Sequence, residues 1–172
     1  MLVAKLEPDE NLRNWHLYKT DPEKYLDLCH RIVQEYPDDP CAYGSRHTAW
    51  LRVGRPDKAM EDIETAIRLR PDSGNFAARG ELLYLQGDIA AALKDFDRAE
   101  ALDPADWSEA FGPVYRAQCH AHLGNLEAAL RDCQSINDQH WTPGIHGMLP
   151  GNRAEITAQI VRIAGEALRR KS

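Results

Sequence analysis

The sequence predicts an all-α protein made of repeated pairs of antiparallel helices, followed by one further helix at the C-terminus. The first indication is a pattern of one glycine, two alanines and one proline that recurs after 33 residues. The first copy has Gly54, Ala59, Ala66 and Pro71, and the second has Gly87, Ala92, Ala99 and Pro104. The second indication is an apolar stripe at helical spacing near the C-terminus, formed by Ile156, Ile160, Ile163, Ala167 and Leu168.

Each copy has the residues that begin and end two helices. A glycine in its middle supplies the positive φ angle that commonly ends a helix. The residue after this glycine is a predicted N-cap, as at Asp88 and Asn125. Small residues allow the two helices to approach closely, and aromatic residues fill the spaces between successive pairs. A proline such as Pro71 stops the second helix, so we expect a helix, a tight turn and a second helix in every copy.

The period and pattern resemble the tetratricopeptide repeat (TPR), a pair of antiparallel helices of about 34 residues. The copy at 73–106 has the full set of residues typical of the family, which are Phe76, Gly80, Gly87, Ala92, Phe96, Ala99 and Pro104. The copy at 40–72 differs where His47 replaces a small residue, and the copy at 110–137 lacks the closing proline. The resemblance implies a solenoid in which the helix pairs form a right-handed superhelix.

The segments outside these copies complete one predicted domain over residues 1–172. Residues 6–39 are interpreted as a degenerate helix pair, with Asp21 and Pro22 at the start of its second helix. The segment 138–151 is rich in glycine and proline, which predicts a loop. The segment 152–171 is expected to form a helix that covers the exposed face of the last pair and begins at an N-cap, Asn152.

Composition and charge exclude several classes of function. The chain has 21 Lys and Arg against 27 Asp and Glu, a net charge of −6, so we expect no nucleic-acid or membrane partner. It has neither an apolar run long enough to span a bilayer nor the apolar core of a signal peptide. The four cysteines have no paired spacing, which indicates reduced thiols and a cytoplasmic protein. Nucleotide-binding and hydrolase motifs are missing, so we expect no enzyme activity and no cofactor.

Arginine and aspartate recur together within the repeats, at two positions that are nearly equidistant from the turn. We therefore predict an Arg–Asp ion pair across each of three helix pairs, with bidentate geometry and a structural role. The predicted pairs are Arg46 with Asp62, Arg79 with Asp95, and Arg116 with Asp132.

The resemblance also implies a partner-binding groove along the concave face of the superhelix. Carried over position by position, the groove is lined by Thr48, Leu51, Arg52, Ala77, Glu81, Tyr84, Leu85, Phe111, Val114, Gln118 and His122. Its centre is apolar and its rim is polar, which favours an amphipathic helix or an extended apolar segment of a protein partner. Members of the family that clamp acidic tails have Lys, Arg and Asn at positions where this chain has other residue types. We therefore expect that the groove does not clamp an acidic tail. The resemblance implies a scaffold or adaptor with no chemistry of its own.

The loop at 138–151 has two structural interpretations. Trp141, Ile145 and Met148 are expected to pack it against the last repeat, since long unpacked loops are rare. The loop, or the N-terminus of the chain, is also a candidate to fill the predicted groove, because monomers seldom expose large apolar patches.

Two other functions are alternatives to the scaffold. A ligand-binding protein, metal site or enzyme would use His140 or His146 in the loop, or His122. The neighbouring Cys119, His120 and His122 do not favour a metal site, because they do not share one helix face. Buried thiols and surface histidines are expected instead. The other alternative is a homodimer formed through the C-terminal helix.

Overall fold

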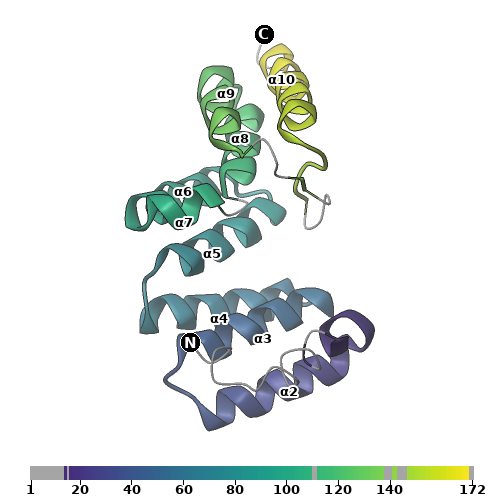
Figure 1. Ribbon diagram of the computed structural model, residues 1–172, viewed down its shortest axis with the longest axis vertical. Coiled ribbons are helices and arrows are strands. Elements are labelled where there is room, and N and C mark those ends of the chain that lie inside the picture. Colours follow the sequence, from purple (N-terminus) through teal and green to yellow (C-terminus); the bar gives the residue numbers. More distant parts are fainter. Residues whose placement is uncertain (1–13, 15, 110–111, 138–140, 143–146, 171–172) are drawn as a thin grey trace. The chain divides into compact units, whose positions relative to one another are not determined.

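The computed structural model describes residues 14, 16–109, 112–137, 141–142 and 147–170 of the chain (Figure 1). Within these residues the protein is all-α, as predicted, with an isolated antiparallel bridge between Thr142 and Gly151 and no strand. The sequence predicts one domain, whereas the chain divides into two compact units between Pro71 and Asp72.

The described part of the first unit contains α2 (Pro22–Glu35), α3 (Pro40–Arg52) and α4 (Pro56–Leu69), preceded by helical residues at 16–20. A proline occupies the start of each of these helices, where its missing N–H costs no helical hydrogen bond. Asp21, as predicted, accepts a hydrogen bond from the Lys24 amide at 3.2 Å, and Asp39 caps α3 in a similar way. α3 packs against α4 and also against α2 (Figure 1).

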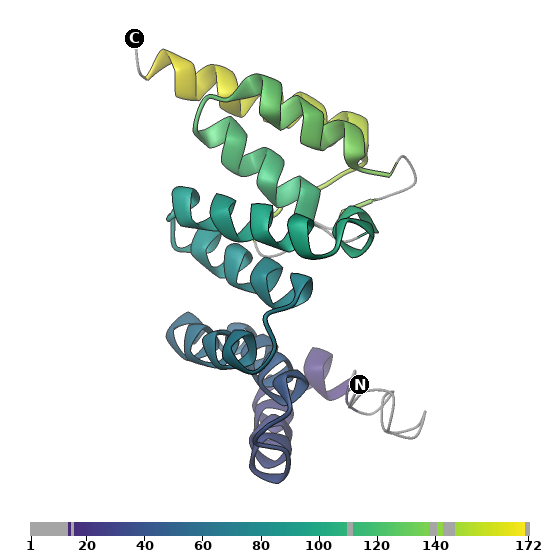
Figure 2. The same cartoon turned by 90° about the vertical axis from the view of Figure 1, so that its left-hand side faces the viewer.

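The described part of the second unit contains α5 (Ser73–Leu85), α6 (Ile89–Leu102), α7 (Pro104–Glu109), α8 (Gly112–His122), α9 (Leu126–Ser135) and α10 (Arg153–Arg169). α5 pairs with α6, and α8 pairs with α9, as the repeat pattern predicts. α10 packs against both α8 and α9 (Figure 2). The short helix α7 is not among the predicted elements; it begins at Pro104, in the last residues of the second copy, and ends just before the third copy. Its Trp107 is 2% exposed, so α7 contributes to the core.

The turn within each helix pair has the backbone geometry that the repeat pattern predicts. Gly54, Gly87 and Gly124 have φ angles of 74°, 85° and 77°, in the left-handed region that favours glycine. Asp88 accepts a hydrogen bond from a backbone amide of α6 at 3.1 Å, which confirms its N-cap role. Asn125 is also the N-cap residue, at the start of α9, with backbone angles close to those of Asp88, but its side chain makes no capping hydrogen bond.

Small residues let the helices of the second unit approach each other closely. A Cβ atom at Gly80 of α5 would lie 2.6 Å from the nearest ring carbon of Phe96 on α6, and Phe96 is fully buried. Phe96 packs in turn against Tyr115 and Trp107, with ring centroids 6.0 and 5.8 Å apart. The missing side chain at Gly80 therefore makes room for the aromatic centre of this core.

The C-terminal helix α10 covers the last helix pair, as predicted. Asn152 begins it with a capping box, in which the Asn152 side chain accepts hydrogen bonds from two backbone amides. Ile156 and Ile160 are fully buried in the core of the second unit. The predicted stripe is wrong at Leu168, which is 49% exposed. Each step of four residues turns the stripe by about 40°, so Leu168 has rotated away from the core that holds the buried Ala164.

Candidate functional site

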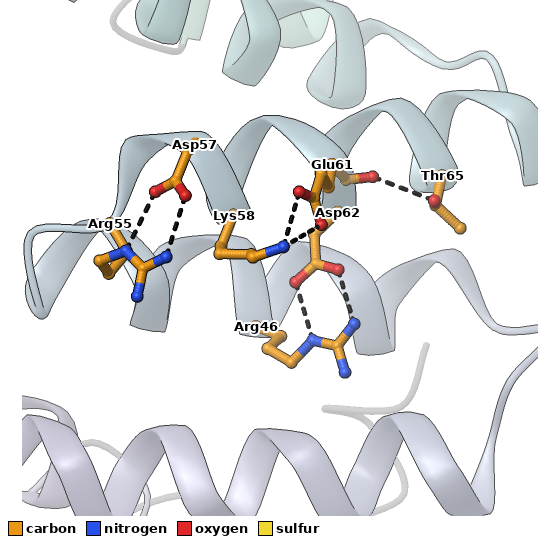
Figure 3. Close-up of polar contacts among 7 residues, drawn as sticks. All are labelled: Arg46, Arg55, Asp57, Lys58, Glu61, Asp62 and Thr65. Carbon is orange, nitrogen blue, oxygen red and sulfur yellow. Dashed lines mark hydrogen bonds and ion pairs between the residues drawn. The ribbon is translucent and has the colours of Figure 1, made fainter.

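Three arginine–aspartate pairs connect the two helices of three helix pairs, at the positions that the sequence predicts. Arg46 of α3 donates from Nε and Nη2 to the two carboxylate oxygens of Asp62 on α4, at 2.8 and 2.6 Å (Figure 3). The other pairs are Arg79 with Asp95 at 2.6 and 2.8 Å, and Arg116 with Asp132 at 3.1, 3.1 and 2.7 Å. The three aspartates are buried, and burying a carboxylate without a partner would cost free energy. The arginines provide the hydrogen bonds that these carboxylates need. The geometry gives the pairs a structural role.

Two histidines lie inside the helix packing, contrary to the expectation of surface histidines. His47 is 6% exposed, at the position where the repeat usually has a small residue. His120 is half-buried, with its Nε2 atom 3.9 Å from an oxygen of Asp132, and burial lowers its pKa. The expectation fails because both residues lie on helix sides that face a neighbouring helix rather than solvent.

Three residues of the predicted groove lie in the first unit. Thr48 donates its hydroxyl to a backbone carbonyl one turn earlier at 3.1 Å, and Leu51 is half-buried. Arg52 is exposed, with its guanidinium 5.1 Å from the ring centroid of Tyr18. The other predicted residues belong to the second unit, where Phe111 lies outside the described residues.

The described groove residues of the second unit form one surface, which we term the α5–α8 face. Its members are Ala77, Glu81, Tyr84 and Leu85 from α5, and Val114, Gln118 and His122 from α8. Their steps of three and four residues place each set on one side of its helix. The Tyr84 hydroxyl connects the two helices, because it accepts a hydrogen bond from the Gln118 amide at 2.6 Å and lies 3.3 Å from His122 Nε2.

The end of the long loop, residues 147–149, lies on the α5–α8 face. The Gln118 side-chain amide donates to the Gly147 carbonyl at 2.9 Å and accepts from the Leu149 backbone amide at 2.9 Å. Gly147 has a φ angle of 76°, and a Cβ atom there would lie 3.1 Å from the Leu85 side chain. The loop therefore occupies part of the predicted groove, held through its backbone by one side chain.

Backbone hydrogen bonds close the base of this loop. Thr142 and Gly151 exchange N–H···O bonds of 3.0 Å in both directions, and Thr142 is fully buried. Met148 is 3% exposed and packs in the core of the second unit, as predicted. The packing predicted for Trp141 is wrong, since this residue is 64% exposed: adjacent side chains point to opposite sides, and Thr142 takes the buried side. The other candidate loop residues, His140, Ile145 and His146, lie outside the described residues.

Part of the α5–α8 face is accessible beside the loop. Leu85 is 44% exposed, His122 is exposed and Tyr84 is half-buried. By contrast, Val114 and Gln118 are each 1% exposed, and Gln118 makes three hydrogen bonds. In this conformation a partner would therefore contact Leu85, Tyr84 and His122 rather than Val114 or Gln118.

Two titratable groups of this face have pKa values shifted by burial. Burial raises the pKa of the half-buried Glu81 carboxyl to about 7. Burial, and then the charge of Arg170, lowers the pKa of His122, which favours the neutral imidazole, whose Nε2 can accept a hydrogen bond from the Tyr84 hydroxyl. His122 also lines a pocket of about 280 Å³, together with Ile163, Glu166 and Ala167 of α10 and with Arg170, the residue that follows this helix.

Comparisons with known proteins give the same architecture. No family model matches the chain. Human tetratricopeptide repeat protein 13 is 27% identical over 100 residues, which cover 58% of this chain and 11% of that protein. Rat DnaJ homolog subfamily C member 3 is 33% identical over 85 residues, 49% of this chain and 17% of that protein. The crystal structure of TTC0263, a TPR protein of Thermus thermophilus, superposes with a TM-score of 0.64 at 17% identity, covering 97% of this chain and 85% of that chain.

The chain has the fold of tetratricopeptide repeat proteins. The repeats in the sequence, the helix pairs in the structure and the solved TPR structure agree on this point. The chain spans 11% and 17% of the lengths of the two curated relatives, so they support its repeat architecture and not the activity of a whole protein.

The described helices offer little other chemistry. Nowhere in the described ranges do three or more His, Cys, Asp or Glu side chains gather in a way that could hold a metal ion. Cys29, Cys119 and Cys133 are buried thiols, as predicted, whereas Cys41 is half-buried. Burial raises the pKa of Cys29 to about 11 and that of Cys119 to about 12, which disfavours their reactive thiolate forms. Among the helices described, none has the length and apolar character needed to cross a membrane.

Proposed function

We propose that this protein is a non-enzymatic scaffold that binds a segment of a protein partner on the α5–α8 face. The proposal is supported above all by residues 147–149, whose backbone is held on that face by the Gln118 side-chain amide. Beside that segment, Leu85, Tyr84 and His122 remain accessible, so the face offers both apolar and polar groups to a segment of another protein.

The accessible part of the face has the composition of a protein-binding surface. Leu85, which is 44% exposed, is flanked by the hydrogen-bonded Tyr84 and His122. Exposed apolar side chains surrounded by polar groups are typical of such surfaces, where the apolar centre provides most of the binding free energy. The TPR resemblance implies the same kind of function.

The proposal is tested by two matched substitutions in the second unit. Leu85→Glu changes the α5–α8 face, and Leu168→Glu changes the outer side of α10, where the leucine is 49% exposed against 44% for Leu85. Tagged wild-type and variant proteins, each first shown to be folded by circular dichroism, are used to purify partners from a lysate of the source organism. We expect Leu85→Glu to lose the partners that wild type retains and Leu168→Glu to keep them.

Two results would contradict the proposal. If Leu85→Glu retained every partner, the α5–α8 face would not be the binding surface. If only Leu168→Glu lost them, the outer side of α10 would be the binding surface, and sedimentation at two protein concentrations would show whether a second copy of the chain is the partner there.

A further inference from the structure

Glu81 is a charged member of the α5–α8 face that the rest of the described chain does not neutralise. It lies within α5, one turn after Ala77 and one turn before Leu85, on the same side of the helix. Its side chain is half-buried, and within the described residues it has no hydrogen bond and no ion pair. A carboxylate in this position loses hydration without gaining a partner.

The buried carboxylates of the described chain show how different Glu81 is. The aspartates that are buried are Asp62, Asp95 and Asp132, and each accepts at least two hydrogen bonds from an arginine. The repeat pattern thus provides a cation wherever a carboxylate serves the packing of a helix pair. Glu81 has no such cation, so a role in helix packing does not account for it.

The groups that face Glu81 are phenols rather than cations. Tyr84 lies one turn away on α5, and the pKa of the Tyr115 hydroxyl on α8 is raised by burial first and then by the Glu81 charge. Among the nearby basic side chains of α5 and α8, Arg79 and Arg116 are bound to aspartates. Burial raises the pKa of the Glu81 carboxyl to about 7, which agrees with a carboxylate that lacks a cation.

We propose that Glu81 is the specificity-determining residue of the α5–α8 face and pairs with a lysine or arginine side chain of the bound partner. This inference rests on the function proposed above and names the chemistry of the partner. A cation beside Glu81 supplies the ion pair that the protein lacks, while apolar atoms of the same segment contact Leu85 one turn further along α5. The net charge of −6 also favours the approach of a basic segment. The expected partner segment is therefore basic and apolar.

The probe for this inference is an array of synthetic peptides of about ten residues, acetylated at the N-terminus so that side chains provide the only cations. One position is Lys, Arg, Gln or Glu, and its neighbours are Leu, Ala, Gly or Ser. Peptides that bind are labelled, and their Kd is measured by fluorescence anisotropy with wild type, Glu81→Gln and a control, Glu127→Gln. Glu127 lies on α9, with a side chain that is 91% exposed and pairs with Arg131. The control therefore removes the same charge from the same unit.

We expect the bound peptides to contain Lys or Arg at the variable position. Glu81→Gln should raise their Kd at least about tenfold, and Glu127→Gln should change it less than about twofold. The Glu81→Gln variant is expected to fold, because the substitution removes a half-buried charge that has no partner. In Glu81→Lys, the preference should change to peptides with Glu at the variable position.

The outcomes separate this inference from the proposed function. One outcome is that peptides bind without preference for a cation, that Leu85→Glu abolishes their binding and that Glu81→Gln does not. This outcome would overturn the role of Glu81 and leave the binding face in place. Peptides whose binding survives both substitutions would overturn both proposals. An array on which no peptide binds wild type would also count against both.

Discussion

The close approach of α5 to α6 predicts opposite effects for one substitution made at two glycines. In Gly80→Ala, the new Cβ atom would lie 2.6, 2.8 and 2.9 Å from three ring carbons of Phe96. Carbon atoms in contact are normally about 3.5–4.0 Å apart, and Phe96 is fully buried and packed against Tyr115 and Trp107. Overpacking of this kind costs about 1–3 kcal/mol, whereas the better helix propensity of alanine returns about 1 kcal/mol. We expect a net loss of up to about 2 kcal/mol, towards the upper end because the neighbouring atoms belong to a fully buried ring.

The matched control is Gly165→Ala in α10 of the same unit. A Cβ atom there would have Arg169 Nη1, the end of a flexible side chain, as its neighbour at 3.7 Å. This variant should gain up to about 1 kcal/mol from helix propensity. In thermal melts followed by circular dichroism, Gly80→Ala should lower Tm and Gly165→Ala should raise it, by about 2–4 °C per kcal/mol. If Gly80→Ala were as stable as wild type, the contact between Gly80 and Phe96 would be incorrect.

Three further predictions follow from the second unit. The pKa of Glu81 is raised from 4.5 to about 7, so the folded state holds a proton that the unfolded state releases, and stability falls as pH rises through this range. Glu81→Gln should therefore gain up to about 3 kcal/mol over wild type above pH 7 and almost nothing below pH 4.5, as measured by urea denaturation at several pH values. Gln118→Leu leaves the Gly147 carbonyl and the Leu149 amide without a partner, so it should destabilise the protein by about 2 kcal/mol and speed proteolysis of the loop; an unchanged digestion rate would argue against this contact. Ile160→Asp places a charge in the core and should cost about 3–5 kcal/mol, whereas an unchanged Tm with loss of a dimer would make α10 an interface rather than a cap.

Features that recur in successive copies were predictable from the sequence, because the same residue types return at the same positions and make the same contact each time. The pair of Arg79 with Asp95 is an example, since the same two residue types recur in the copies on either side. The turn glycines, such as Gly87, follow the same logic, because every copy needs the same positive φ angle. Asn125 has the predicted N-cap position but not the capping hydrogen bond that Asp88 makes, so a shared position does not ensure a shared hydrogen bond.

Contacts that occur once were not predictable in the same way. The Gln118 side chain contacts Gly147 and Leu149, which lie 29 and 31 residues later in the chain. No sequence repeat relates these positions to Gln118. The sequence left open whether the loop fills the groove, and this contact decides it for residues 147–149. Trp141 and Leu168 were expected to be buried because they are apolar, but apolar residues also occupy much of a protein surface. Which side of the backbone they face depends on packing that the local pattern does not include.

The measurement that tests the account most directly is a photo-crosslinking experiment at two positions. A photoreactive phenylalanine analogue replaces either Leu85 on the α5–α8 face or Leu168 on the outer side of α10, and each protein is irradiated in a lysate of the source organism. The account predicts that position 85 gives a crosslinked partner whose attached peptide contains Lys or Arg beside apolar residues, and that position 168 gives none. Crosslinks from position 168 alone, or an acidic peptide attached at position 85, would contradict it.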